Sequence, residues 1–263
     1  MSIPKKNNIT GAGEKVIMFA RGFGCDQNMW RYVAPAFEKN YRIVKFGHVG
    51  AGNSDLSAYS YTRYNSLEGY AEDILAIAAE LNLRDIIFVG RSVSSIIGMI
   101  AAQMALALFG KLVLVAPSPC YINEQGYTGG FSKSEIDELL VSINQIHLGW
   151  SAAIAPVIMD DQNSSELKEE LTTNFYKTSP EIAKYFARTT FLTDRRDILE
   201  NCTVPGLILQ CTDDIIAPIA VGKHGRSKMP GSKRVILTAT GHCSNLSAPE
   251  PTTAVILKYL YDA

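Results

Sequence analysis

Short runs of hydrophobic residues alternate along the chain with longer segments whose apolar positions recur every three or four residues. The runs are Lys15 to Ala20, Tyr41 to Phe46, Asp85 to Gly90, Lys111 to Ala116, Pro205 to Cys211 and Arg234 to Thr238. Runs of this length are typical of buried strands, and helix-like spacing separates the first four and follows the last two. The alternation predicts a mostly parallel, doubly wound sheet.

The segment from residue 120 to residue 195 breaks this alternation. It contains no convincing strand, and its apolar positions follow helical spacing over Ser134 to Leu148, Ser164 to Tyr176 and Ser179 to Phe191. Ser179 followed by Pro180 is a favourable helix start, because serine caps the first turn and proline fits the first helical position. We therefore expect a helical cap at residues 120–195, inserted after the fourth strand, and a core formed by residues 1–119 and 196–263.

Composition and charge exclude several classes of function. The chain has 263 residues, of which 47% are hydrophobic and 19% charged, which is enough for one large α/β domain with an insertion. A formal net charge of −1 provides no basic field, so we expect neither nucleic acid nor a membrane surface as a partner. The first ten residues lack the apolar stretch of a signal peptide, and no apolar run approaches membrane-spanning length.

Cysteine usage points to a reducing compartment. The chain has five cysteines, which are scattered, at Cys25, Cys120, Cys202, Cys211 and Cys243. Their odd number and the lack of a C-x-x-C pair are typical of reduced thiols in a cytoplasmic protein. The pattern predicts neither a disulfide framework nor a metal site, and we expect no cofactor.

The stretch FVGRSVS, residues 88–94, is the first candidate for chemistry. An apolar run stops at Gly90, and a helical series begins at Val93, so Ser92 is expected on a sharp turn between a strand and a helix. The nucleophile elbow G-x-S-x-G has this context, although Ser94 stands here in place of the second glycine. Taken alone, Ser92 is more readily explained as the N-cap of a helix.

Two further candidates follow later strands. Asp213 and Asp214 come at the end of the run GLILQC, and His242 lies in the loop after RVILT. Each has an ordinary explanation, as a turn residue, a cap or a loop histidine. Together with Ser92, however, they have the chain order of α/β-hydrolase triads, and all fall where ligands bind in open α/β sheets, beyond the carboxyl ends of the strands. The combination predicts serine, histidine and carboxylate chemistry.

Several motifs together resemble one family over nearly the whole chain. The motifs are GFGCDQNMW, GHVGAGNSD, RYNSLEGYAEDI, GRSVSSIIGM, SPCYINEQGYTGGF, LQCTDDIIAP and GHCSNLSAP. They resemble the RsbQ-type α/β-hydrolases, bacterial regulators of the energy-stress branch of the general stress response. The plant karrikin and strigolactone receptors are similar. The resemblance implies an α/β-hydrolase fold and a family elbow that tolerates serine at position 94.

The same resemblance assigns roles to individual residues. Ser92 would be the nucleophile, His242 the general base, and Asp214 the orienting acid, with Asp213 only a neighbour. The backbone N–H groups of Val93 and Phe23 would form the oxyanion hole.

Three positions depart from the family pattern. Arg91 and Arg21 stand where relatives usually have histidine, or proline at position 21, and Gly47 replaces an aspartate. Gly47 would remove a hydrogen bond that stabilises a turn. The two arginines add positive charge that would lower the pKa of His242, and the alternative is that both guanidiniums reach solvent or a carboxylate.

A pocket under the cap is expected to be small and apolar. We expect it to be lined by Arg91, Phe131, Trp150, Ile154, Phe186 and Cys243, although packing between cap helices is the default explanation for any one apolar side chain. His147 and His224 are expected to be surface or structural residues.

Two functions remain open on the sequence. One is a hydrolase that turns over a small hydrophobic ester or lactone. The other is a ligand-sensing, receptor-like module in which slow or single-turnover hydrolysis accompanies binding. The RsbQ resemblance implies signalling as a positive regulator of a stress sigma factor, with a PAS-domain serine/threonine phosphatase as partner.

Overall fold

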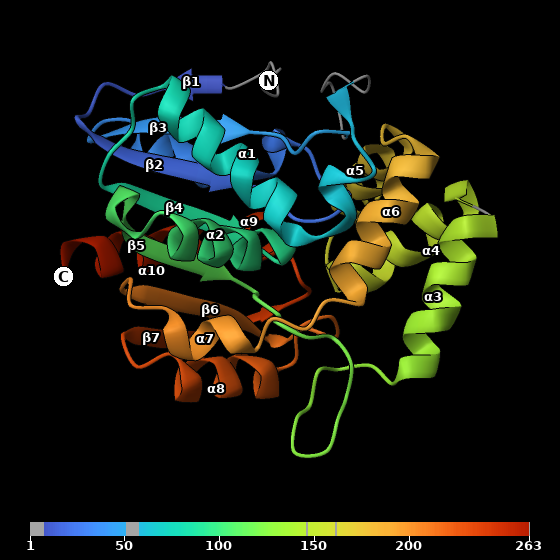
Figure 1. The fold of residues 1–263 in the computed structure, drawn as a ribbon. Helices are drawn as coiled ribbons and strands as arrows, with labels where there is room; N and C mark the ends of the chain where they lie inside the picture. Colours follow the sequence, from blue (N-terminus) through green and yellow to red (C-terminus); the bar gives the residue numbers. More distant parts are fainter. Residues whose placement is uncertain (1–7, 51–57, 146, 161, 263) are drawn as a thin grey trace.

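A seven-stranded sheet runs through the centre of the molecule in the computed structural model, which describes residues 8–50, 58–145, 147–160 and 162–262 (Figure 1). The strands are β1 Asn8–Thr10, β2 Lys15–Ala20, β3 Tyr41–Phe46, β4 Ile86–Arg91, β5 Phe109–Val115, β6 Gly206–Asp213 and β7 Ser232–Thr240. Their order is β1-β3-β2-β4-β5-β6-β7; β1 is antiparallel to β3 and every other pair is parallel. The predicted, mostly parallel sheet is confirmed.

All six predicted strands are present, with shifted ends. β4 extends one residue further than expected and includes Arg91, and β7 is longer at both ends. The short edge strand β1 was not predicted, because its three residues, Asn8–Thr10, are largely exposed and carry no apolar pattern. It is held by pairing to β3 rather than by burial.

Helices cover both faces of the sheet (Figure 1). Outside the cap they are α1 Leu67–Glu80, α2 Val93–Met104, α7 Asp197–Asn201, α8 Ile219–Lys228, α9 Ser244–Ser247 and α10 Pro249–Tyr261. In Figure 1, α1, α2 and α8 lie on the face toward the viewer and α10 lies behind the sheet. The loops that leave the carboxyl ends of β4, β6 and β7 therefore open toward the same edge, as the doubly wound topology requires.

The remaining helices form a group beside that edge, and they are called the cap helices, or the cap, below (Figure 1). They are α3 Lys133–Gln145, α4 His147–Met159, α5 Ser165–Tyr176 and α6 Pro180–Phe191. The chain enters and leaves this group at adjacent points, because the Arg195 N–H donates to the Pro119 carbonyl at 2.8 Å and Cys120 pairs with Asp194 in an isolated bridge. The division into a core and a cap at residues 120–195 stays a prediction.

The sequence pattern anticipated α3, α5 and α6 but not α4. Ser179 occupies the N-cap position of α6 and Pro180 its first turn, although the Ser179 side chain makes no capping hydrogen bond. α4 is apolar at most of its positions and contains Pro156, so no amphipathic stripe marks it in the sequence. Its helical state depends on packing against α5 and α3.

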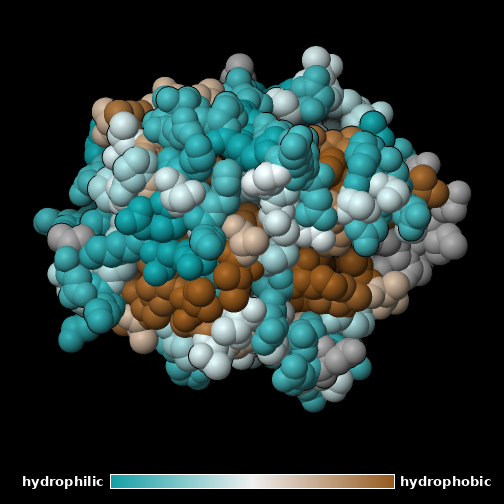
Figure 2. Space-filling model, turned by 90° about the horizontal axis from the view of Figure 1, so that it is seen from below, coloured by the Kyte–Doolittle hydropathy of each residue, from teal (hydrophilic) through white to brown (hydrophobic). Residues whose placement is uncertain are grey.

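Apolar side chains are also exposed at the lower end of the sheet. Figure 2, seen from the side on which α8 and β7 lie in Figure 1, shows hydrophobic residues gathered in patches. The exposed apolar residues in and beside these elements include Ile215, Ile219 and Ile236. In the described part of the chain, no helix has the length and apolar character needed to cross a membrane.

Candidate active site

The turn between β4 and α2 holds Ser92 in an unusual backbone conformation. Its φ is 56° and its ψ is −129°, in a region that residues other than glycine rarely adopt. Gly90 allows the turn to close, since a Cβ there would lie 2.6 Å from the carbonyl oxygen of Ser94. The Ser92 N–H donates to the Val115 carbonyl at 2.8 Å, which ties the turn to the neighbouring strand β5. The sharp turn predicted for FVGRSVS is present.

The hydroxyl of Ser92 faces a histidine and does not cap the helix. Ser92 stands at the N-cap position of α2, yet its side chain makes no capping hydrogen bond. Its Oγ lies 2.8 Å from Nε2 of His242, and Nδ1 of the same ring lies 2.7 Å from Oδ2 of Asp214. All three side chains are buried. Strand ends more than a hundred residues apart thus meet in one chain of hydrogen bonds.

The two neighbouring aspartates have different surroundings. Asp214 is buried, and its second carboxylate oxygen accepts the N–H groups of Ile216 and Ala217 at 2.9 and 3.0 Å. Asp213 is the last residue of β6 and is exposed. Hydrogen bonds therefore hold both carboxylate oxygens of Asp214 in place, whereas Asp213 does not contact the histidine.

The loop that carries His242 is attached to the cap. The His242 N–H donates to the Ile158 carbonyl of α4 at 2.8 Å. Gly241 has a φ of 81°, and a Cβ at this position would collide with the carbonyl oxygen of Met159. The end of α4 therefore sets the position of the histidine from the cap side.

Burial keeps the imidazole neutral. Burial lowers the pKa of His242 below its ordinary value; Asp214 opposes this effect, and the charge of Arg91 adds to it. In the neutral ring, Nδ1–H donates to Asp214 and Nε2 accepts the Ser92 hydroxyl proton. This is the arrangement in which a histidine can remove a proton from serine.

Arg91 lies inside the protein, so the alternative in which its guanidinium reaches solvent or a carboxylate is wrong. Its side chain is 2% exposed. Nε and Nη2 donate to the carbonyl oxygen of His242 at 3.3 and 3.2 Å, and Nη2 also donates to Sγ of Cys243 at 2.8 Å. Nη1 donates to Sγ of Cys25 at 3.4 Å. The guanidinium thus connects the histidine loop to the loop after β2.

Arg21 is likewise buried, and it holds the other side of the site. Its guanidinium donates to the carbonyls of Cys25 and His48, and its own carbonyl accepts the Ser94 hydroxyl. Nε2 of His48 lies 2.7 Å from Oγ of Ser94. Because the single hydroxyl proton of Ser94 goes to Arg21, His48 is the donor in this pair.

This network gives Ser94 and Gly47 a structural context. Ser94 does more than replace a small glycine, because its hydroxyl fixes the start of the segment from Arg21 to Cys25. A Cβ at Gly47 would lie 3.8 Å from Nε of Arg21, so the site has room for a side chain there. His48 was missed by sequence analysis, although its place just after β3 could have marked it.

The residues expected to bind an oxyanion flank Ser92. Val93 is the first residue of α2, where a helix offers no acceptor for the backbone N–H. Phe23 lies in the segment that Arg21 and Ser94 hold, and its ring packs on Phe175, Phe186 and Phe191. Their function as an oxyanion hole stays a prediction.

A small cavity lies over Ser92, with a volume of about 30 Å³. It is lined by residues of the core and of the cap, which are Phe23, Arg91, Ser92, Tyr121, Leu139, Ile154, Ile158, Thr190, Phe191, Ile216 and His242. Burial raises the pKa of Tyr121 to about 12, against the opposing effects of Ser92 and Arg91, so its hydroxyl stays protonated. The wall combines apolar side chains with the polar groups of five residues, which are Arg91, Ser92, Tyr121, Thr190 and His242.

The lining agrees only in part with the predicted pocket. Arg91 and Ile154 line the cavity as expected. Phe186 does not, because its ring packs behind Phe23 and against Tyr70.

Two more of the expected residues also lie elsewhere. Cys243 turns its sulfur to Arg91, and Phe131 pairs through its backbone with residues 121–123. The side chains of Trp150 and His147 lie outside the described residues, and His224 contacts the ring of Tyr127. Sequence analysis missed Tyr121, although the motif SPCYINEQGYTGGF contains it, and Thr190, whose position no motif marks.

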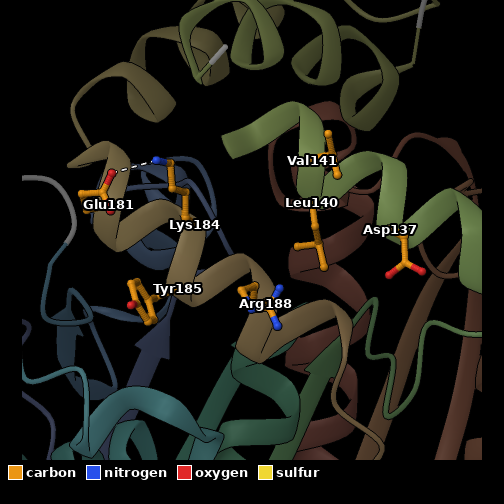
Figure 3. Close-up of a pocket in the computed structure, with 7 residues that line it drawn as sticks. All are labelled: Asp137, Leu140, Val141, Glu181, Lys184, Tyr185 and Arg188. Carbon is orange, nitrogen blue, oxygen red and sulfur yellow. Dashed lines mark hydrogen bonds and ion pairs between the residues drawn. The ribbon is translucent and has the colours of Figure 1, made fainter. Parts of the chain in front are cut away.

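Larger hollows occur away from Ser92. One of about 520 Å³ lies between α3 and α6 on the cap and is lined by Asp137, Leu140, Val141, Glu181, Lys184, Tyr185 and Arg188 (Figure 3). Lys184 pairs there with Glu181 at 2.7 Å. Another, of about 380 Å³, lies on the outer side of the Asp213–Asp214 turn. Neither hollow is lined by a serine or a histidine, so the smaller cavity is the candidate active site.

Known proteins share both the fold and the length of this chain. The model of the Alpha/beta hydrolase family matches residues 17–255. Karrikin insensitive 2 receptor IA of Petunia hybrida is 36% identical over 253 residues, which cover 96% of this chain and 92% of that protein. Strigolactone esterase D14 of Arabidopsis thaliana is 32% identical over 242 residues, which cover 92% of this chain and 90% of that protein. The chain therefore belongs to the alpha/beta hydrolase family.

A solved structure supports the same conclusion. A hydrolase from Oleispira antarctica has a TM-score of 0.95 and 39% sequence identity, and the match covers 98% of this chain and 94% of that one. The predicted fold and the similarity to plant karrikin and strigolactone receptors are confirmed. The RsbQ-type assignment stays a prediction.

Proposed function

We propose that the protein is a serine hydrolase that cleaves a small hydrophobic ester or lactone. The observation that carries this proposal is the hydrogen-bonded series from Ser92 through His242 to Asp214, at the base of a small apolar cavity. A serine, a histidine and a carboxylate connected by hydrogen bonds in this way perform acyl transfer on unrelated folds.

In the proposed mechanism Ser92 is the nucleophile, His242 acts first as base and then as acid, and Asp214 holds the imidazole. Oγ of Ser92 attacks the ester carbonyl carbon while Nε2 of His242 takes the hydroxyl proton, and Asp214 stabilises the resulting imidazolium. The N–H groups of Val93 and Phe23 bind the oxyanion of the tetrahedral intermediate. The imidazolium then protonates the leaving alkoxide, which leaves an acyl group on Ser92. In the second half-reaction His242 deprotonates a water molecule that attacks the acyl carbon, and the imidazolium then returns the proton to Oγ of Ser92 as the acid leaves.

The cavity supports a small apolar substrate. Its volume of about 30 Å³ has room for about two water molecules, since each needs roughly 10–15 Å³. The cavity is therefore too small for an ester, and the groups around it must move to admit one. One relative, strigolactone esterase D14 of Arabidopsis thaliana, is named as an esterase.

We further propose that the chain acts in cytoplasmic signalling as an RsbQ-type regulator with a PAS-domain phosphatase as partner. The RsbQ-type role and the phosphatase partner are supported by the sequence motifs. The five free cysteines support a reducing compartment. The alternative is a receptor in which binding is the main role and turnover is slow. A relative named as a receptor, karrikin insensitive 2 receptor IA, favours this alternative.

Pre-steady-state hydrolysis of 4-nitrophenyl acetate tests the chemistry and separates the two roles. A hydrolase releases 4-nitrophenol continuously over many turnovers, whereas a receptor-like module releases one equivalent in a burst and then turns over slowly. Intact-protein mass spectrometry should find the acyl group on Ser92, and the Ser92→Ala variant should show neither burst nor adduct. Equal product release by that variant would contradict the proposal.

A further inference from the structure

Thr190 is a polar residue in the cap wall of the cavity over Ser92. It lies on α6, is 1% exposed and lines the cavity together with Ser92 and His242. Its hydroxyl makes no hydrogen bond to any of the described residues. A buried hydroxyl without a partner is unfavourable, and such groups are uncommon in folded proteins.

Thr190 differs both from its neighbours in the cavity wall and from another threonine in the cap helices. The other residues of helices α3, α4 and α6 that line the cavity are apolar: Leu139, Ile154, Ile158 and Phe191. Threonine in a helix commonly donates to a carbonyl of the preceding turn, as Thr172 of α5 does to Lys168 at 2.9 Å. Thr190 makes no such bond, so its hydroxyl stays available.

We propose that the Thr190 hydroxyl donates a hydrogen bond to a second oxygen atom of the substrate. This inference rests on the proposed function and narrows its substrate class. The reacting carbonyl oxygen is directed to the N–H groups beside Ser92, so the atom that reaches the cap wall is a different one. The substrate is then a small ester with an ether or keto oxygen beyond the reacting carbonyl, or a lactone whose ring oxygen faces the cap.

Rotation about χ1 brings the hydroxyl to the ligand. The hydroxyl and the methyl group of threonine have nearly the same size, and a threonine in a helix populates two χ1 rotamers. Exchange of the two groups changes the polarity of the cavity wall without changing its volume. A site built to bind a polar atom discriminates against the analogue that lacks this atom.

A matched pair of esters tests the proposal. 4-Nitrophenyl methoxyacetate and 4-nitrophenyl butanoate have acyl chains of equal length and differ by one ether oxygen in place of a methylene group. We compare kcat/KM for the two after dividing each by its rate of alkaline hydrolysis. Thr190→Val should lower the ratio of methoxyacetate to butanoate by about tenfold, which corresponds to the loss of one hydrogen bond.

Two variants serve as controls. Thr190→Ser keeps the hydroxyl and should keep the ratio close to that of the unmodified protein. Thr172→Val removes a cap hydroxyl that is already bonded within its helix and should leave the ratio unchanged. An unchanged ratio in Thr190→Val would overturn the proposal, even where both esters are hydrolysed through Ser92.

Binding to the Ser92→Ala variant separates this inference from the proposed function. δ-Valerolactone and cyclohexanone have rings of equal size and differ by the ring oxygen. Isothermal titration should show tighter binding of the lactone, and a second substitution, Thr190→Val, should remove that preference. This measurement needs no turnover, so it decides the role of Thr190 even where neither ester is cleaved. Equal affinities for both rings before the second substitution would contradict the proposal.

Discussion

The guanidinium of Arg91 is bonded to the backbone of His242, with Nε and Nη2 at 3.3 and 3.2 Å from its carbonyl oxygen. The cation is buried, and Arg91 is only 2% exposed. It therefore acts on the histidine in two ways, by fixing its loop and by disfavouring a second positive charge on the ring.

Replacing Arg91 should change the pH dependence of catalysis. Because the charge of Arg91 contributes to the lowered pKa of His242, Arg91→His should raise that pKa. The acidic limb of kcat/KM then moves to higher pH, since the base must be neutral. The measurement is a pH–rate profile on a neutral ester. Salt should hardly change the difference, because a buried charge is screened little; an exposed Arg91 would have implied a strong salt effect.

Arg91→Lys is the matched control for that experiment. It keeps the positive charge but cannot donate in the same fork geometry. The acidic limb should stay in place while kcat falls, because the loop that carries His242 is held less firmly. Superimposable limbs for Arg91→His and the unmodified protein would show that the charge does not affect the base.

Ser92→Ala should lower kcat for ester hydrolysis by three orders of magnitude or more. Removing a serine nucleophile of this kind costs up to about 10⁶-fold in kcat. The thermal midpoint should hardly change, because the hydroxyl contributes its hydrogen bond to His242 but little packing. Calorimetry and a chromogenic ester assay measure both properties. Activity above about a tenth of the original would exclude Ser92 as the nucleophile.

The two aspartates offer a test within one turn. Asp214→Asn should reduce kcat by about 10²–10⁴, because the amide cannot hold the imidazole in the same tautomer. Asp213→Asn is the control at the neighbouring, exposed position, and it should retain nearly full activity. The measurement is steady-state kinetics of both variants on one ester. Equal losses of kcat in the two variants would show that the contact between Asp214 and His242 is not needed for catalysis.

Gly241→Ala should weaken both stability and activity. The residue has a φ of 81°, and an added methyl group would collide with the Met159 carbonyl at the end of α4. We expect a loss of about 1–3 kcal/mol in the free energy of unfolding and a lower kcat, since His242 is next in the chain. Gly126→Ala is the control, because Gly126 has a φ of 79° with open space around it. Equal effects of the two would mean that contact with the cap does not matter.

Stability should decrease in mild acid because of His48. Burial and the charge of Arg21 lower its pKa well below the ordinary value of 6.5. The unfolded chain then binds a proton that the folded protein does not, so stability is full above pH 6.5 and falls as the pH drops below it. Thermal midpoints between pH 8 and pH 5 measure this fall, and His48→Gln should make it shallower. An unchanged slope would show that His48 is not responsible.

Much of the site could be predicted because its signals are local. The apolar run before Gly90 and the helical series after Ser92 define an elbow within a dozen residues, and neither depends on distant contacts. Chain order and strand ends then bring Asp214 and His242 to the same edge, since parallel strands share the direction of their carboxyl ends. For these residues the sequence by itself determined the arrangement that the structure shows.

The tertiary structure alone decided the environment of that site. Arg91 and Phe186 have unremarkable local patterns, yet one is buried between two loops and the other packs behind Phe23. The hydroxyl of Thr190, which has no hydrogen-bond partner among the residues that the structure describes, and the bond from Ser94 to Arg21 both depend on segments far apart in the chain. Burial and side-chain direction come from packing between such segments, and a linear pattern of hydrophobic and polar residues does not contain that information.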